Sequence, residues 1–149
     1  MVWWYIRLFP PFDFRDSRYS RVFCAGIKGR VAADVIDAGA VPENYIGPII
    51  KKAPENLLIV DAVDFGARPG TIRLLTPQSL SSLTTSTHAP SLCLFVDLLR
   101  NEIPVEVCFI GIQPAQTGLN QPLSPPVAQA VKSLTETLAR AFPQSSPPC

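Results

Sequence analysis

The sequence predicts an α/β fold in which helices cover both faces of a twisted, mostly parallel sheet. Three observations support this prediction. Short apolar runs bounded by turn residues alternate along the chain with longer segments of helical periodicity. The run Leu57–Val60 is apolar at every position, as expected for a strand that is buried on both faces of a parallel sheet. A chain of 149 residues, 47% hydrophobic, is also long enough to form one core without disulfides.

The predicted elements begin with a strand and a short helix. The mostly apolar run Val31–Ile36 predicts the strand, which ends at an Asp-Ala-Gly turn. The helix covers Pro42–Lys52, and Pro48 either kinks it or marks its true first turn. Leu57–Val60 then forms the central strand, and a Pro-Gly turn leads into Thr71–Leu75, a strand near the edge of the sheet.

A helix, a strand and a longer helix complete the domain. Apolar residues recur at helical spacing over Ser91–Arg100, and the apolar run Val105–Ile112 indicates a further buried strand. The last helix covers Pro126–Phe142, with an apolar stripe made of Val127, Val131, Leu134 and Leu138. From Pro143 onward, a tail rich in proline and serine is predicted to be disordered. We therefore expect an atypical segment over residues 1–23, one α/β domain over residues 24–142 and a tail over residues 143–149.

Charge and cysteine content exclude several classes of protein. The net charge of +1 gives no electrostatic basis for binding nucleic acid or an anionic membrane. No apolar run approaches the ~20 residues that a membrane-spanning helix needs. The cysteines have no metal-binding spacing, so we interpret them as free thiols in a reducing compartment such as the cytoplasm: Cys24, Cys93, Cys108 and Cys149.

Acidic residues collect where the predicted strands end. Asp61 directly follows the central strand, and ligand-binding groups gather at the carboxyl ends of strands in open α/β sheets. It is therefore a candidate metal ligand, although it could merely cap a turn through its own backbone. Asp64 we interpret as the residue that forms an Asx-turn beside Gly66. Asp37 and Gly39 follow the first strand and are candidates to contact a peptide substrate, although Asp37 could instead cap the next helix.

His88 is the only histidine of the chain and a candidate partner for Asp61. It lies in the polar segment Thr84–Ser91, immediately before an apolar helical repeat. It could equally be a helix-entry residue that bonds to a carbonyl group. One carboxylate and one imidazole suit divalent ions such as nickel or zinc, but two groups alone do not complete a metal site.

Four short sequence motifs occur in the order and at the approximate spacing that one protein family shows. They are V-P-E-N at residues 41–44, the stretch from Leu57 to Gly70 with its D-A-x-D-x-G, S-T-H at residues 86–88, and F-I-G-I-Q-P at residues 109–114. Together they resemble the hydrogenase maturation endopeptidases, and among these the type that processes the large subunit of formate-hydrogenlyase-like nickel–iron hydrogenases. The resemblance covers Cys24–Phe142.

This resemblance implies a cytoplasmic, monomeric endopeptidase of three-layer αβα architecture. Its partner is the hydrogenase large-subunit precursor, from which it removes a short C-terminal extension after nickel insertion. Nickel carried by that substrate is the recognition element, and Asp61 and His88 match an aspartate and the histidine that bind it and act in catalysis. We expect both side chains to point into one crevice, roughly 3–5 Å apart. Whether Asp61 binds nickel, works with a metal-bound water or acts as a general base stays open.

The N-terminal segment departs from the family pattern. Family members begin with a strand and a loop G-x-G-N-x-x-x-x-D-D-G-x-G that supplies a further ligand, whereas this chain has no glycine before Gly26 and only Asp13 and Asp16 as acids there. We expect residues 1–20 to pack poorly, without the usual first strand, leaving an apolar edge beside Val31–Ile36. Two alternatives to an active peptidase remain: a truncated, catalytically impaired member that only binds the precursor, and an unrelated small-molecule-binding α/β domain.

Overall fold

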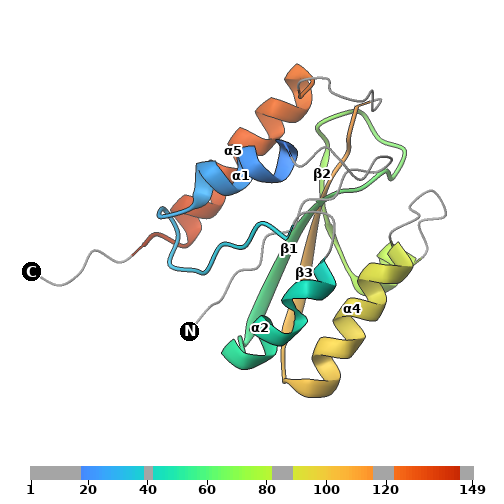
Figure 1. Ribbon diagram of the computed structural model, residues 1–149. Coiled ribbons are helices and arrows are strands. Elements are labelled where there is room, and N and C mark those ends of the chain that lie inside the picture. Colours follow the sequence, from blue (N-terminus) through green and yellow to red (C-terminus); the bar gives the residue numbers. More distant parts are fainter. Residues whose placement is uncertain (1–17, 39–41, 82–88, 116–122, 145–149) are drawn as a thin grey trace, which may run out of the picture.

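The computed structural model describes residues 18–38, 42–81, 89–115 and 123–144 of the chain. Within these ranges the elements follow one another as α1 (Arg18–Ile27), the 3₁₀ turn η1 (Pro42–Tyr45), α2 (Ile46–Lys52), β1 (Asn56–Ala62), β2 (Ile72–Leu75), α3 (Pro77–Ser81), α4 (Ala89–Glu102), β3 (Glu106–Ile112) and α5 (Pro125–Ala141) (Figure 1). This succession confirms the predicted α/β class. None of these helices is long and apolar enough to cross a membrane.

The three described strands form one sheet in the order β1-β3-β2. β1 and β3 are parallel, and β2 is antiparallel to β3. The sheet is therefore mixed in the described part of the chain, not mostly parallel as predicted. The reason lies in the connection between β1 and β2, which is too short to return the chain to the other end of the sheet for a parallel strand. β2 lies at an edge of this sheet, as its sequence indicated. β1, predicted as the central strand, forms the other edge of the described sheet, and β3 lies between the two.

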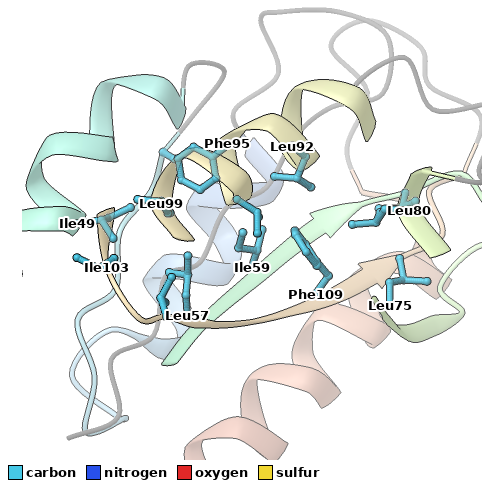
Figure 2. Packing of buried hydrophobic residues seen from close by; sticks show 14 residues of the cluster. Ile49, Leu57, Ile59, Leu75, Leu80, Leu92, Phe95, Leu99, Ile103 and Phe109 are labelled. Carbon is cyan, nitrogen blue, oxygen red and sulfur yellow. The ribbon is translucent and has the colours of Figure 1, made fainter. Parts of the chain in front are cut away.

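Alternate residues of β1 contribute to two hydrophobic clusters on opposite faces of the sheet. On one face, residues of helices α2, α3 and α4 share a cluster with Leu57 and Ile59 of β1, and Figure 2 shows the labelled side chains of this cluster. On the other face, α1 and α5 pack against Leu58 and Val60, and the two helices lie side by side in Figure 1. Helices on both faces explain why this strand is apolar at four consecutive positions.

The helices form where their apolar periodicity predicts them. The buried residues of α5 include its whole predicted stripe, Val127, Val131, Leu134 and Leu138. Those of α4 recur at the same helical spacing: Leu92, Phe95, Val96 and Leu99. In α2, Pro48 is the third residue, so it lies in the first turn and interrupts no intrahelical hydrogen bond.

The segment over residues 31–36 is not a strand. Val35 packs against the cluster of α1 and α5, and Ile36 packs against the cluster of α2 and α4, which accounts for the apolar character of this segment. The segment nevertheless joins no ladder of the described sheet. Instead, the N–H of Ala32 donates a hydrogen bond to the carbonyl of Phe142 at the end of α5, with a length of 3.1 Å.

The first residues of the predicted tail are held by this same segment. Pro143 forms an isolated bridge with Val31, and the N–H of Gln144 donates to the carbonyl of Arg30 at 3.3 Å. The prediction of disorder is therefore wrong for Pro143 and Gln144. Residues 145–149 lie outside the described ranges.

Helix α1 is an element that the sequence did not lead us to expect. Phe23 and Ile27 are fully buried in it, and Gly26 allows a close approach to Thr135 of α5. The helix begins at Arg18, so the end of the segment predicted to pack poorly forms the start of a helix. The apolar edge predicted beside residues 31–36 is not formed, because that segment is not a strand. Residues 1–17, which include Asp13 and Asp16, lie outside the described ranges.

Candidate active site

Asp61 is the only charged residue of β1 and lies inside the strand, one residue before its end. Its residue is 5% exposed. Because strand side chains alternate between faces, Asp61 projects to the same face as Ile59 and Val63, on which α4 packs. Its Oδ1 accepts a hydrogen bond from the N–H of Ala62 at 2.8 Å. The carboxylate is therefore mounted on a rigid element at the carboxyl end of the parallel pair, the position that the sequence predicted.

Gly111 of β3 leaves room beside Asp61, and the loop after β1 fills it. The two residues are register partners in the parallel pair. A Cβ atom at Gly111 would lie 2.8 Å from Leu75 Cδ1, and 3.3 Å from both Phe65 Cε1 and Val63 Cβ. A larger residue would therefore displace the side chains that cover β3 next to the carboxylate.

A cation lies on the far side of this glycine. Arg73 of β2 is the antiparallel register partner of Gly111, and its neighbour Leu75 belongs to the same cluster as Ile59. Arg73 therefore projects to the same face as Asp61. Its guanidinium carbon lies 4.6 Å from the centroid of the Phe65 ring, a cation–π distance. The row across the three strands thus consists of a carboxylate, a glycine under an aromatic ring, and an exposed guanidinium.

The side chain of Gln113 fixes the loop that follows Asp61. Its Oε1 accepts hydrogen bonds from the N–H groups of Phe65 at 2.9 Å and Ala67 at 3.1 Å, and its Nε2 donates to Asp64 Oδ1 at 3.0 Å. Asp64 Oδ1 also accepts from the N–H of Gly66 at 3.0 Å, which confirms the predicted Asx-turn. The Gln113 amide and, next, the Gly66 N–H hold the pKa of Asp64 below its usual range.

His88 lies outside the described residues, so its predicted meeting with Asp61 in one crevice stays a prediction. Two observations bear on it. Helix α4 begins at Ala89, directly after His88 in the chain, and α4 covers the face to which Asp61 projects. The other end of α4, at Glu102, precedes the start of β3 by a few residues, so the helix begins toward the carboxyl end of the sheet.

The predicted substrate contacts are Asp37 and Gly39. Gly39 lies outside the described ranges. Asp37 is half-buried, and its backbone carbonyl accepts a hydrogen bond from the Tyr45 hydroxyl at 3.2 Å. This bond ties the segment to η1, and the contact of Asp37 with a substrate stays a prediction.

The described cysteines are poorly suited to nucleophilic catalysis. Cys24, Cys93 and Cys108 are free thiols, as predicted, and Cys149 lies outside the described ranges. Burial and, next, the Asp37 carboxylate raise the pKa of Cys24 to about 12. Burial also raises the pKa of Cys93 and of Cys108. Since the thiolate is the nucleophilic form, the raised pKa of each thiol lowers its nucleophilic fraction near neutral pH.

Metal binding by this site needs ligands beyond those described. Within residues 18–38, 42–81, 89–115 and 123–144, no three His, Cys, Asp or Glu side chains are grouped so that they could hold a metal ion. A divalent transition metal takes at least four ligands. A complete site around Asp61 therefore needs ligands beyond the described residues, such as residues outside these ranges, water or groups of a substrate.

Fold and site define an α/β domain with a buried carboxylate at the carboxyl end of a parallel strand pair. Residues 26–141 match the family model of HycI, the hydrogenase maturation proteases. The chain belongs to this family of proteases. The motifs in the sequence had indicated the same family.

Individual relatives agree with this assignment. The hydrogenase 3 maturation protease of Escherichia coli K12 is 40% identical over 105 residues, which are 70% of this chain and 67% of that protein. The solution structure of the endopeptidase HycI from Escherichia coli has a TM-score of 0.76 at 28% identity and covers 98% of this chain and 97% of its own. The crystal structure of a nickel–iron hydrogenase maturation protease HycI from Thermococcus kodakarensis KOD1 has a TM-score of 0.77 at 25% identity, with coverages of 93% and 91%.

Proposed function

We propose that this protein is an endopeptidase that removes the C-terminal extension of a nickel–iron hydrogenase large subunit after nickel insertion. The observation that carries the proposal is the position of Asp61, the only charged residue of a strand in the sheet of a maturation protease domain. Asp61 directly follows the apolar run Leu57–Val60 and lies at the carboxyl end of the parallel pair, where ligand-binding groups collect in open α/β sheets. The proposal includes a three-layer αβα architecture. It is supported by the helices that pack on both faces of the described sheet.

In this proposal, nickel enters the site as part of the substrate. Asp61 and His88 are its proposed ligands on the enzyme, and the remaining coordination sphere belongs to the precursor. A carboxylate on a hydrogen-bonded strand presents the metal with a fixed geometry. Asp37 and Gly39 are proposed to contact the substrate peptide. The two roles open to Asp61 are that of nickel ligand and that of general base for the attacking water.

We propose that the protein works in the cytoplasm, on the basis of its family and of its free thiols. Reducing compartments such as the cytoplasm keep cysteines free, as the described cysteines are. The proposed enzyme is a monomer with the hydrogenase large-subunit precursor as its partner.

A second candidate function is binding of the precursor without cleavage. It is favoured by the sequence of residues 1–25, which contains no G-x-G-N and no D-D-G motif. Under this candidate, Asp61 and His88 still recognise the loaded precursor, and the cleavage step is slow because the third ligand is missing. Loss of one positioning group can cost orders of magnitude in rate.

The test is cleavage of nickel-loaded and nickel-free precursor by the unsubstituted chain, Asp61→Asn and His88→Ala. We expect cleavage of the loaded precursor alone, and a loss of at least about 100-fold in both variants, because each removes a positioning group. Asp97→Asn, at an exposed position of α4, is the matched control and retains full rate. If the unsubstituted chain binds precursor without cleaving it, the second candidate is correct, and a G-x-G-N-x-x-x-x-D-D-G-x-G segment ahead of Cys24 should restore cleavage. Full activity of Asp61→Asn contradicts both candidates.

A further inference from the structure

Gln113 is a buried polar residue that directly follows β3, and all its hydrogen-bonding groups are engaged. It is 6% exposed. Its backbone N–H donates to the carbonyl of Thr71 at 2.8 Å, and its carbonyl accepts from the N–H of Gly70 at 2.9 Å. Its side-chain oxygen accepts two backbone N–H groups, and its side-chain nitrogen donates to Asp64 and, at 3.4 Å, to the carbonyl of Pro114.

Nearly all hydrogen-bond partners of Gln113 lie in one segment of the chain. Apart from the contact with Pro114, every partner of Gln113 belongs to the connection between β1 and β2, residues 63–71. This connection begins immediately after the strand that carries Asp61. Gln113 is therefore hydrogen-bonded to the first half of this connection through its side chain and to the end of the connection through its backbone.

The connection forms the wall next to Asp61. The N–H of Val63 donates to the carbonyl of Ile112 at 3.0 Å, so the parallel pairing continues past the strand end. Phe65, whose N–H is bound by Gln113, lies over Gly111, the register partner of Asp61. A change in the bonds to Gln113 therefore moves the ring beside the carboxylate.

A primary amide is required for this set of bonds. The carbonyl oxygen of Gln113 faces two N–H donors, and its NH₂ group faces the Asp64 carboxylate. A glutamate at this position keeps the acceptor but has no donor, and it brings a second carboxylate against Asp64. An apolar side chain leaves two backbone N–H groups without their acceptor, which is costly in a buried setting.

We propose that Gln113 is a positioning residue for the peptidase reaction. It holds residues 64–67 so that the wall beside Asp61 is already formed when the precursor arrives. Such preorganisation acts on the rate of the chemical step more than on capture of the substrate. The inference rests on the proposed role of Asp61 in the site.

The experiment is a donor–acceptor exchange between residues 113 and 64. Gln113→Glu alone opposes two carboxylates, and we expect kcat to fall about tenfold to 100-fold, as small misplacements at a reacting centre do, with KM changed by less than about threefold. Asp64→Asn alone keeps an acceptor for Gln113, and its effect is small. The double variant Gln113→Glu with Asp64→Asn removes the opposed charges and again places an amide opposite a carboxylate, but the NH₂ group that faces residue 113 then takes the place of the oxygen that accepts the Gly66 N–H. We therefore expect a partial rescue, with kcat at least about threefold above that of Gln113→Glu alone.

A structural role alone gives a different result. Destabilisation lowers the folded fraction, so all rates are measured where circular dichroism shows each variant to be fully folded. Gln129→Glu makes the same substitution on the exposed side of α5 and controls for the added charge. Amide hydrogen exchange at Phe65 and Ala67 is a second readout that needs no cleavage. It should accelerate at least about tenfold in Gln113→Glu and recover in the double variant, because the bonds to residue 113 protect these amides.

Two outcomes overturn the proposal. One is a Gln113→Glu chain whose kcat per folded molecule and amide exchange equal those of Gln129→Glu. The other is a double variant that recovers neither quantity. Asp61→Asn, assayed alongside, distinguishes a failure of the role proposed for Gln113 from a failure of the role proposed for Asp61. If Gln113→Glu is impaired and rescued while Asp61→Asn cleaves normally, the proposed role of Asp61 fails, and the wall acts on a different reacting group.

Discussion

Gly70→Ala tests how tightly the connection after β1 is fitted against α5. Gly70 has a φ of 84°, in the left-handed region that favours glycine. A Cβ atom at Gly70 would lie 2.5 Å from the carbonyl oxygen of Pro126 and 2.8 Å from its carbonyl carbon. Pro126 belongs to the first turn of α5, and Val127, the next residue, is buried. The clash is therefore with helix backbone, which cannot be relieved by rotating a side chain.

The expected cost has two parts. Alanine in the left-handed region costs about 1–2 kcal/mol. An ordinary contact distance also requires α5 to shift by roughly 1 Å, an overpacking penalty of about 1–3 kcal/mol. The sum is about 3 kcal/mol of the free energy of unfolding, which for a chain of this size corresponds to a fall in Tm of roughly 6–12 °C.

The assay is urea unfolding followed by circular dichroism, with Gly29→Ala as the matched control. Gly29 has a φ of 76°, and a Cβ atom there meets nothing within 4 Å. Gly29→Ala should therefore lose only the cost of the left-handed backbone conformation, about 1–2 kcal/mol of the free energy of unfolding. The difference between the variants isolates the contact with Pro126. Equal losses of stability in the two variants would refute the reasoning, since they would mean that α5 yields to the new methyl group at no cost.

Three further predictions concern the same framework. Because the pKa of Asp64 is lowered by its donors, its carboxylate stabilises the fold above its ordinary pKa, and this contribution is lost as the pH falls through the lowered value. The stability gap between the unsubstituted chain and Asp64→Asn should thus narrow from about pH 7 to about pH 3, and a gap that widens toward acid contradicts the assignment. Cys24, with a pKa of about 12, should resist alkylation in native protein near neutral pH and react once urea unfolds it, as read by peptide mass spectrometry; rapid native labelling would contradict its burial. Phe109→Ala should cost about 3–5 kcal/mol in urea unfolding, since this ring is 2% exposed between the sheet and α4, and a loss below about 1 kcal/mol would show that the cluster can collapse around it.

The strands and long helices were predictable because their signals are local. Four consecutive apolar residues at Leu57–Val60 indicated a strand with both faces buried, and β1 has helices on both faces. The apolar stripe of α5 lies within one element, so its period can be read without knowing the rest of the fold. Asp61 was identified for a similar reason, since it interrupts an apolar run. Only its place inside β1, one residue before the strand end, was missed.

The errors arose where a long-range partner decides the structure. The residues over 31–36 form a mostly apolar run like that of a strand, but the backbone of Ala32 bonds to Phe142, more than a hundred positions away in the chain. That same contact orders the start of the predicted tail at Pro143. The mixed sheet has a different origin, because the connection between β1 and β2 is too short for a parallel return, and this length could have been read from the sequence.

Gln113 itself could not be assigned a role from the sequence. The motif G-I-Q-P contributed to the family resemblance, but the hydrogen-bond partners of its glutamine precede it by more than forty residues. A usable signal was present. Gln113 is a polar residue directly after an apolar run, and the same reasoning had singled out Asp61. Polar residues at the ends of both parallel strands were equally informative.

The mounting of Asp61 inside a paired strand also determines how the protein can fail. The residue is 5% exposed, and its strand is held by the ladder with β3 and by clusters on both faces. Asp61 nevertheless lies one residue before the end of a strand at the edge of the described sheet, and strand ends open at a lower free energy than the centre of a sheet. Opening of this strand end exposes the carboxylate to bulk water while the rest of the sheet stays paired. Moderate heat should therefore lower activity before circular dichroism reports unfolding of the domain.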